Sequence, residues 1–546
     1  MKPGRLWGIA ALLVAGIGCS TSSASGGGSG SSWEAADSDN NGSKLDFPPG
    51  GDGWGGVSSG TDSKKGSTPG VDLPPEKEPE SDFGAPEGSP NYVYVPATNA
   101  DQLVRISGAT LQVSLVEVSA QPTVVKTIPG QDAAIVLHRG SDEVAVVRSS
   151  EKGDEVATLA ALPHCNALAI DPKGAHAVVW YDYSHAKPGD PVGSFQALTL
   201  LRLNAGKDES LGISTGFRPS AVQFTADGSK ALVVTEDGVN IITLATAQDG
   251  DIAPLVAITT KPLQKVEREV LTTDDGVWAV IRETGKAALT IVHLPSKKIV
   301  DVPLAATPTD LDLVPGGKAA LVVLRDAGEV ALVTLPAAAT EVFHVAAAQM
   351  GDLTAGLARV TDDGKTALLY TSVAGIEQVA TLDLTTGLVK PVLIKKTVDN
   401  ALIVPGTRKA ILLHRPEKGP GYSDPAEKFV DDAHGYTLFD LDTGYTKLVL
   451  TPVKPTEIAF STAPDKAWLL LPDPANLDHV VQVAALTTFL TVDQPLGSKP
   501  EHARYLVKAG VVAVTQQHPS GRITFLNGKS GIAKTVTGYE LNGKVN

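Results

Sequence analysis

The sequence has 546 residues, of which 42% are hydrophobic and 5% aromatic, and a formal net charge of -15. This length and apolar content exclude wholesale disorder, because the chain can bury several cores or one large repeat array. The acidic balance excludes a nucleic-acid surface, which needs clustered Lys and Arg, so we expect neutral or cationic partners.

The first 18 residues are typical of a bacterial export signal. An apolar run from Leu6 to Ile17 follows two basic residues and is too short to span a bilayer permanently. The run ends AGIGCS (residues 15–20), which resembles the lipobox of bacterial lipoproteins, although Gly16 stands where Leu is usual. The resemblance implies that Cys19 is the lipidated first residue of the mature chain. It also implies a lipid anchor in the bacterial cell envelope, with Ser20 favouring the outer membrane.

Ordinary signal-peptidase cleavage, which would give a secreted protein without acylation, is the alternative for this N-terminus. Residues 19–90 are rich in Gly, Ser, Pro and Asp, and acidic residues outnumber lysines among them. Such a segment cannot bury enough apolar surface to offset its ordering entropy, so we expect a disordered tether. Its DSDNNG stretch (residues 37–42) copies the opening of an EF-hand loop, but Pro48 stands where the last glutamate ligand belongs. We therefore expect a solvated linker there rather than a calcium site.

Residues 91–546 show short strands of alternating apolar residues separated by Gly, Pro and Asp turns, which predicts an all-β domain. The stretch VTDDGKTALLY (residues 360–370) is one such unit: a strand, an Asp-Gly turn and a second strand. Similar turns recur every 41 to 59 residues, at Gly130, Gly174, Gly228, Gly276, Gly317, Gly364, Gly406, Asp465 and Gly510. This spacing, with about four strands per repeat, predicts the blades of a β-propeller.

The turns and the opening NYVYVPATNADQLVRIS from Asn91 resemble bacterial YVTN and WD40-like propeller repeats. The resemblance implies architecture and no particular activity. Nine turns plus a partial first unit suggest nine or ten repeats, within a range of about seven to ten. One large ring, two joined propellers, or turns that do not mark blades remain open. We expect Asn91 to Val118 to complete a blade with a C-terminal strand near Thr535 to Leu541, which would hide two sheet edges.

Two repeats carry long loops after their second strand, Tyr181 to Phe195 and His414 to Tyr436, and the repeat phase predicts that both emerge on one face. Loops on a rigid scaffold are where binding usually resides. The candidate binding residues are Tyr181, His185, Phe195, His414, Tyr422, Asp431, Asp432 and His434.

These histidines and carboxylates could hold a metal or act in acid–base chemistry, but solvated loop charges are the favoured interpretation. No spacing matches a metal, phosphate or nucleophile motif, so no catalytic residue, metal or cofactor is assigned. Cys165 begins an apolar strand, which predicts a buried thiol rather than a nucleophile.

We therefore expect a non-enzymatic, envelope-anchored lipoprotein whose propeller binds or scaffolds an envelope protein. The alternative is a propeller enzyme, such as a hydrolase, lactonase or dehydrogenase, with its site at the mouth of the axial channel. Convergent carboxylates and histidines at the channel would favour the enzyme, whereas a channel of Ala, Val and Thr would exclude it. Glycan binding is a third interpretation, which the low aromatic content disfavours.

Overall fold

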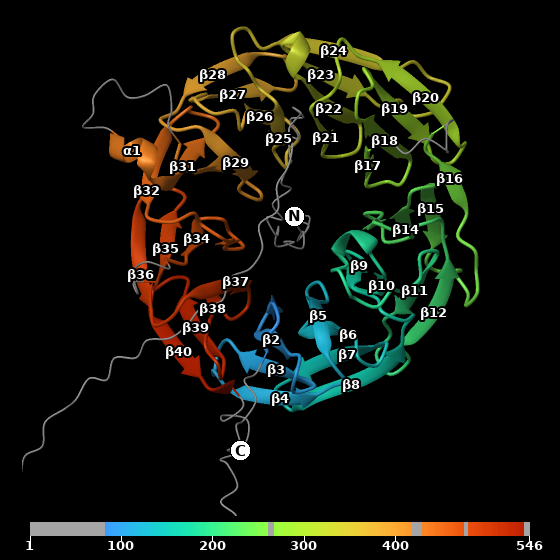
Figure 1. The fold of residues 1–546 in the computed structure, drawn as a ribbon, viewed down its shortest axis with the longest axis vertical. Helices are drawn as coiled ribbons and strands as arrows, with labels where there is room; N and C mark the ends of the chain where they lie inside the picture. Colours follow the sequence, from blue (N-terminus) through green and yellow to red (C-terminus); the bar gives the residue numbers. More distant parts are fainter. Residues whose placement is uncertain (1–81, 260–266, 418–427, 474–478, 540–546) are drawn as a thin grey trace, which may run out of the picture. The chain divides into compact units, whose positions relative to one another are not determined.

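The computed structural model describes residues 82–259, 267–417, 428–473 and 479–539. These residues form ten four-stranded antiparallel sheets that follow one another around a ring, a β-propeller of ten blades (Figure 1). The predicted fold class is confirmed, and its blade number lies above the four to eight that are typical. Cys19 and the predicted tether up to residue 81 lie outside the described residues. Within the described part, no helix is long and apolar enough to cross a membrane.

Each blade takes its four strands in chain order, from the ring's centre outward. Blades 1 to 5 consist of β1 (Glu87–Gly88), β2 (Tyr92–Ala97), β3 (Gln102–Ser107) and β4 (Val113–Glu117); β5 (Pro122–Thr127), β6 (Ala133–His138), β7 (Glu143–Ser150) and β8 (Gly153–Ala160); β9 (Ala167–Ile170), β10 (His176–Trp180), β11 (Ala197–Arg202) and β12 (Glu209–Ser214); β13 (Ala221–Phe224), β14 (Lys230–Val234), β15 (Gly238–Thr243) and β16 (Leu255–Ala257); and β17 (Arg268–Thr272), β18 (Trp278–Glu283), β19 (Ala288–His293) and β20 (Lys298–Pro303).

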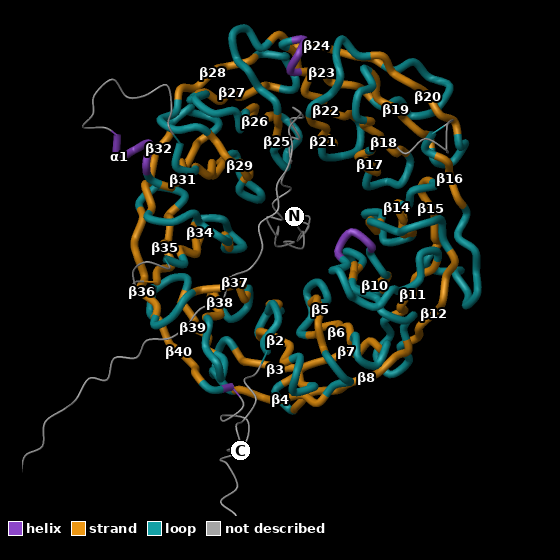
Figure 2. Tube along the Cα trace, viewed as in Figure 1, coloured by secondary structure: helices purple, strands orange, loops and turns teal. Residues whose placement is uncertain are grey.

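The second half of the ring repeats this arrangement. Blades 6 to 10 consist of β21 (Asp310–Val314), β22 (Ala319–Leu324), β23 (Glu329–Thr334) and β24 (His344–Gln349); β25 (Leu357–Val360), β26 (Thr366–Tyr370), β27 (Gln378–Asp383) and β28 (Val389–Leu393); β29 (Val398–Ile403), β30 (Lys409–His414), β31 (His434–Asp440) and β32 (Thr446–Thr451); β33 (Ile458–Phe460), β34 (Lys466–Leu471), β35 (His479–Ala485) and β36 (Thr491–Leu496); and β37 (Pro500–Leu506), β38 (Val511–Gln516), β39 (Arg522–Asn527) and β40 (Ala533–Thr537). The helical elements described are short: η1 (Tyr183–His185), η2 (Arg325–Ala327) and α1 (Lys428–Asp432) (Figure 2).

The predicted Asp-Gly turns join the inner strand of a blade to its second strand. In three blades a buried threonine follows the inner strand, and its Oγ1 donates to the aspartate two residues on, as Thr361 does to Asp363 at 2.6 Å. The same Oγ1 accepts the amide of Thr366 at 3.2 Å, so one hydroxyl closes both sides of the turn. Gly364 then adopts a φ of +67°, which favours glycine. This local chemistry explains why the turns mark the blades in register.

The core of the propeller lies between blades. Among the described residues, each pair of neighbouring blades encloses its own cluster of buried apolar side chains. The second and third strands supply most of these side chains, and β6, β22 and β26 are buried along their whole length. A four-stranded blade cannot cover both of its faces alone, so the blades are stable only as a ring.

The predicted closure, in which a C-terminal strand completes the first blade, is wrong. The first sheet contains β1 to β4 alone and the last contains β37 to β40 alone. The first blade obtains its inner strand from Glu87–Gly88, ahead of Asn91, where the predicted repeat domain begins. The sequence pattern placed these two residues in the tether, because two residues are too few to show the alternation of apolar and polar residues that marks a strand.

Side chains close the ring between blades 10 and 1 instead. One apolar cluster combines Val93 and Ile106 with Leu506 and Phe525. The Pro90 carbonyl accepts the amides of residues 508 and 509 at 2.9 and 3.2 Å. Apolar packing and backbone hydrogen bonds therefore join blades 10 and 1, where the sequence predicted a shared blade.

Chain direction divides the connections between two faces of the propeller. Hairpins from first to second and from third to outer strands share one side, which we call the turn face. Loops from second to third strands, and connections from one blade to the next, share the other side, which we call the loop face. Both long loops join second to third strands, between β10 and β11 and between β30 and β31. They therefore emerge on one face, as the repeat phase predicts.

Candidate binding surface on the loop face

The first long loop, between β10 and β11, is fixed at its root by Asp182 and Asn166. The Asp182 carboxylate is buried and accepts the amide and hydroxyl of Ser184 at 2.8 and 2.6 Å, which caps η1. The Asn166 side chain makes two hydrogen bonds to the Asp182 backbone: its Oδ1 accepts the Asp182 amide at 2.7 Å, and its Nδ2 donates to the Asp182 carbonyl at 3.0 Å. The loop is therefore positioned by paired polar groups. His185 contacts the same carboxylate, with Nδ1 2.9 Å from Asp182 Oδ2, while the His185 side chain is 71% exposed.

Aromatic rings gather above this root. Phe195 meets Tyr181 and Tyr183 edge to face, with centroids 5.8 and 5.9 Å apart, and meets Phe217 at 5.8 Å. The loop passes so close to Tyr181 that a Cβ on Gly193 would lie 2.7 Å from the Tyr181 Cβ. The predicted residues Tyr181 and Phe195 are thus brought together.

Arg218 completes this group from the connection between blades 3 and 4. Its guanidinium carbon lies 4.4 Å from the Tyr183 ring centroid, 5.0 Å from that of Phe217 and 5.6 Å from that of Phe195. Its amide donates to the Phe195 carbonyl at 2.7 Å, and Nη1 pairs with Glu236 at 3.0 Å. We call Tyr183, Phe195, Phe217 and Arg218 the Arg218 cluster.

Part of the Arg218 cluster is exposed at the surface, where a partner could contact it. Tyr183 is 51% exposed and the Arg218 side chain 30%. The Nε of Arg218 is buried and has no hydrogen-bond partner among the described residues. An arginine that is stacked on aromatic faces and partly exposed is suited to contact a partner. The sequence pattern did not identify Phe217 and Arg218 as candidates, because the connection between β12 and β13 that carries them has ordinary length. The Gly-Phe-Arg-Pro run, placed between two blades, was the available signal.

The second long loop places its predicted residues differently. His414 is fully buried, with Nδ1 2.9 Å from the Thr397 carbonyl oxygen and Nε2 2.8 Å from Thr437 Oγ1. Burial lowers the pKa of His414 to about 4, so the ring is neutral at pH 7. It is therefore a structural residue of blade 8 and has no exposed ring to offer a ligand.

Asp431 and Asp432 belong to α1, and His434 opens β31. The Asp432 side chain is exposed, 3.9 Å from Lys428, whereas the Asp431 carbonyl accepts an amide from the chain at Glu417 at 2.9 Å. Burial lowers the pKa of His434, and its Nδ1 has no hydrogen-bond partner in the described part of the chain. Tyr422 lies outside the described residues.

A buried lysine docks this second loop onto the propeller. Lys396 donates through Nζ to the carbonyls of Val430 and Asp431 in α1. Its burial lowers its pKa, although the surrounding carboxylates oppose that shift. The same environment raises the pKa of Glu377, chiefly by burial and next by repulsion from Asp431. Lys396 is engaged by backbone oxygens, so it acts here as an anchor for α1.

The two long loops share a face but not a site. Blade 3 and blade 8 lie on opposite sides of the ring (Figure 1). Within the described ranges, no group of three or more His, Cys, Asp or Glu side chains could hold a metal ion. The loop face therefore presents two separate surfaces: the Arg218 cluster, in which a guanidinium stacks on aromatic rings, and α1, where Phe429 and Lys428 are exposed.

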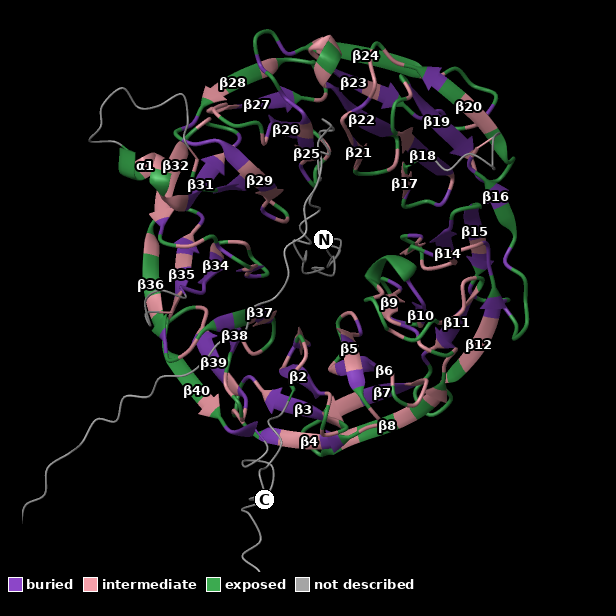
Figure 3. Ribbon diagram, viewed as in Figure 1, coloured by how far each residue is buried: buried purple, intermediate pink, exposed green. Residues whose placement is uncertain are grey.

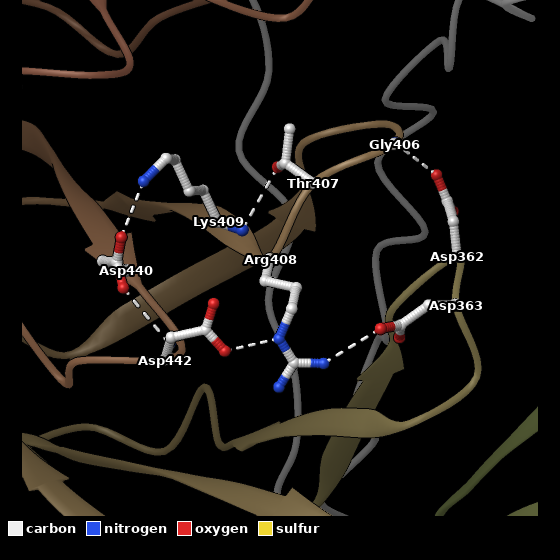
Figure 4. Close-up of a pocket in the computed structure, with 8 residues that line it drawn as sticks. All are labelled: Asp362, Asp363, Gly406, Thr407, Arg408, Lys409, Asp440 and Asp442. Carbon is white, nitrogen blue, oxygen red and sulfur yellow. Dashed lines mark hydrogen bonds and ion pairs between the residues drawn. The ribbon is translucent and has the colours of Figure 1, made fainter.

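On the turn face, a recess of about 530 Å³ lies between blades 7 and 8 (Figure 4). Its centre is Arg408, which pairs with Asp363 at 3.0 Å and also with Asp442. Lys409 pairs with Asp440 at 2.6 Å. Arg408 thus joins blades 7 and 8 through ion pairs, while the lining as a whole has four carboxylates and two cations.

Charged residues also line the inner strands, where the alternative enzyme would have its site. Most are paired between neighbouring blades, as Glu87 is with Lys126 at 2.8 Å and with Arg504 at 3.6 Å. Asp312 on β21 differs, because its Oδ2 is buried without a hydrogen-bond partner among the described residues. Burial raises the pKa of Asp312 to about 7, and neighbouring Asp310 adds to the rise. The inner wall is therefore neither purely apolar nor a convergent cluster of carboxylates and histidines.

No protein-family model matches the chain, and no curated protein matches it. Solved structures that it is similar to include a eukaryotic initiation factor, at 12% identity over 77% of this chain and 96% of that one, with a TM-score of 0.48. Another is the dihydro-heme d1 dehydrogenase NirN in complex with DHE, at 14% identity over 74% and 80%, with a TM-score of 0.41. Apo AztD from Citrobacter koseri matches at 14% identity over 65% and 92%, with a TM-score of 0.39. No functional conclusion follows from likenesses this distant.

Proposed function

We propose that this chain is a non-enzymatic binding protein of the bacterial envelope, whose propeller captures a protein partner on its loop face. The observation that carries the proposal is the Arg218 cluster, in which three rings hold a partly exposed guanidinium. Tyr and Arg are among the residue types that dominate binding energy at protein interfaces. They occur here on the face that carries the two long loops.

The cluster is also held in place before any partner arrives. The Asn166–Asp182 hydrogen bonds fix the loop root, and Glu236 pairs with the Arg218 guanidinium. Few rotamers remain to be frozen on binding, so little side-chain entropy is lost in forming the complex. The exposed part of the Arg218 side chain would suit a carboxylate or carbonyl of the partner.

The lipid anchor is a second part of the proposal and rests on the sequence alone. Acylated Cys19 followed by a long polar tether would let the propeller stand off the membrane and reach partners in the envelope. Mass spectrometry of the mature N-terminal peptide tests this part. An acylated N-terminal cysteine is expected, whereas an unmodified N-terminus at another residue would refute the anchor and leave the binding face untouched.

Site-specific photocrosslinking in the native bacterium tests the binding face. A benzoylphenylalanine replaces Tyr183 in one full-length protein and Tyr445 in another, because both tyrosines are about equally exposed, at 51% and 58%. Tyr445 lies on the turn face, between β31 and β32. We expect a discrete protein adduct from position 183 and none from position 445. Equal labelling at both positions, or none at either, would contradict the proposal.

The partner identified in this way permits a quantitative test. Because a hot-spot arginine contributes at least about 2 kcal/mol, Arg218→Ala should weaken binding about thirtyfold. Arg202→Ala is the matched control, since Arg202 lies at the end of β11 toward the turn face. An Arg218→Ala protein that binds as tightly as the wild type would sink the assignment of the cluster.

The alternative of an axial enzyme is favoured by one specific observation: the buried Oδ2 of Asp312 has no hydrogen-bond partner in the part of the chain that the structure describes. A carboxyl group whose pKa lies near 7 can act as a general acid or base at neutral pH. A panel of ester and lactone substrates tests this candidate: turnover by the wild-type protein that Asp312→Asn abolishes would support it. Turnover that survives Asp312→Asn would remove Asp312 from consideration.

A further inference from the structure

The outer strand of every blade has one edge that no neighbouring strand covers. Proteins protect such edges with charges, prolines, short strands or covering segments, because an open edge invites pairing with another chain. Eight of the ten outer strands here contain a charged residue, and three of those also contain proline: β4, β8, β12, β20, β28, β32, β36 and β40. β16 is protected by its length of three residues. β24 alone has no such protection.

β24 (His344–Gln349) reads HVAAAQ and contains neither a formal charge nor proline. Five of its six residues are exposed, which Figure 3 shows as a nearly continuous exposed strand. Val345 is 44% exposed, and Val342 just before the strand is 74% exposed. The three alanines leave the backbone edge open to a second strand.

The outer backbone edge of β24 is also uncovered by the rest of the chain. β24 pairs with β23 from His344–Thr334 through Gln349–Glu329, and among the described residues no other backbone hydrogen bond reaches it. β12 shows the contrasting case, because the amides of Gly250 and Ala253 bond to its outer carbonyls at 2.8 and 2.9 Å. The chain thus covers one edge and leaves another available.

The charges around β24 indicate which chemistry would dock there. Glu341 precedes the strand, Asp352 follows it, and both are exposed. Glu329 lies beside the end of the strand, where its carboxylate accepts a hydrogen bond from the side-chain amide of Gln349 at 2.8 Å. A neutral strand flanked by carboxylates suits a partner strand whose centre is uncharged and whose ends are basic.

The same charges disfavour a second copy of this chain as the occupant. In antiparallel self-pairing centred between Ala346 and Ala347, Glu341 of one copy would face Asp352 of the other. Like charges placed opposite each other destabilise a strand pair, and both ends of the pair would carry this repulsion. The net charge of -15 on each chain adds to it.

We propose that the outer edge of β24 is a β-augmentation site, which accepts an extended segment of a partner protein with an uncharged centre and Lys or Arg at its ends. Backbone N–H and C=O groups of the segment would pair with the open edge and add a fifth strand to blade 6. The flanking carboxylates would set the register. This rim surface is separate from the Arg218 cluster on the loop face of blade 3 and does not depend on it.

Peptide probes test the site on the wild-type propeller. The first is a fluorescent peptide of alternating Val and Thr with lysines at both ends. The second has glutamates at its ends, and the third has lysines but carries methylated backbone nitrogens throughout its centre. We expect the first to bind and the other two to bind at least about tenfold more weakly, because they lose the charge match or the backbone donors. Equal binding of the methylated peptide would overturn strand addition.

Hydrogen exchange locates the binding and distinguishes the occupants. The lysine-ended peptide should slow amide exchange in 344–349 and leave β40 unchanged. Slowed exchange elsewhere, with none in β24, would overturn the assignment. Slowed exchange in β24 at high protein concentration without peptide, together with a dimer in light scattering, would overturn it in favour of a second copy.

Two proline variants complete the test. Successive N–H groups point to opposite sides of a strand, so one of Ala346→Pro and Ala347→Pro removes an outward donor and the other breaks a bond to β23. The outward one should keep the wild-type melting temperature and lose peptide binding. Retained binding in that variant would count against the site. If both variants unfold, the methylated peptide and the exchange measurement still decide the matter.

Discussion

Arg504 closes the ring, and its removal should destabilise the propeller more than that of any exposed cation. The side chain lies on β37, is 6% exposed, and pairs with Glu457 ahead of β33 and with Glu87 on β1. It therefore links blades 9, 10 and 1, where no strand is exchanged. Removing one member of a buried ion pair leaves uncompensated charge and costs about 3–5 kcal/mol. We expect Arg504→Met to lower the free energy of unfolding by about 3 kcal/mol, or the melting temperature by about 3 °C for a domain of this size.

Urea unfolding followed by tryptophan fluorescence measures this effect at the relevant boundary. Trp468 of blade 9 stacks on Tyr505 of blade 10, with ring centroids 5.7 Å apart. Lys428→Met is the control, because the Lys428 side chain is 70% exposed and such surface pairs contribute at most about 1 kcal/mol. An Arg504→Met midpoint equal to that of Lys428→Met would refute the closure argument.

The paired carboxylates supply an internal check. Glu457→Gln and Glu87→Gln, combined with Arg504→Met, should restore part of the lost stability because they remove the stranded charges. Burial raises the pKa of Glu457, but His502 and Arg504 together outweigh it and leave the pKa lowered. Its contribution to stability is therefore present above the ordinary glutamate pKa and is lost as pH falls through the lowered value.

Three further predictions concern the loop face and the core. The pKa of His414 is about 4 in the folded protein and about 6.5 in the unfolded chain, so the free energy of unfolding should fall by roughly 3 kcal/mol as pH drops from 6.5 to 4. The urea midpoint of His414→Gln should depend less on pH over this range than that of the wild type. An equal pH dependence in the two proteins would argue against a role for His414. Gly193→Ala should displace the first long loop, because the new Cβ would lie 2.7 Å from Tyr181 Cβ and 2.8 Å from the Pro163 carbonyl; faster proteolysis within 181–195 is expected, with Ser194→Ala as control, and wild-type protection would contradict the contact. Cys165 is buried and its thiol pKa is raised to about 12, so it should resist iodoacetamide at pH 7 until the protein unfolds; rapid labelling of the native protein would show that the thiol is accessible.

The sequence predicted the repeat phase well because the turns that mark each repeat form from residues that are close together in the sequence. The Thr361–Asp363–Gly364 turn needs only neighbouring residues to form, so its pattern is visible without the fold. In every blade that carries a turn landmark, the second strand begins one to three residues after that landmark. The buried thiol of Cys165 was predicted for a similar reason, since it lies just ahead of the apolar residues of β9.

Closure and the site depended on contacts that the sequence pattern does not record. Glu87–Gly88 is too short for a period, and its role as the first inner strand exists only through pairing with β2. Tyr181 and Phe195 were found because their loop is long, whereas Arg218 reaches them from a connection between blades. His414 looked like a loop residue, but it ends β30 with its ring turned into the blade.

The repeat phase fixes the face on which a loop emerges, but the blade number fixes its position around the ring. The loops of blades 3 and 8 share a face and are five blades apart in a ring of ten, so they emerge on opposite sides (Figure 1). A partner that touches Arg218 therefore meets the connections of blades 3 and 4 before it meets α1. Because the described parts of the two loops lie on opposite sides of the ring, substitutions in these parts should act additively on any ligand that spans the ring and independently on ligands that do not. The proposed binding surface is thus formed by neighbouring blades 3 and 4, whereas loop length alone would have grouped it with the distant loop of blade 8.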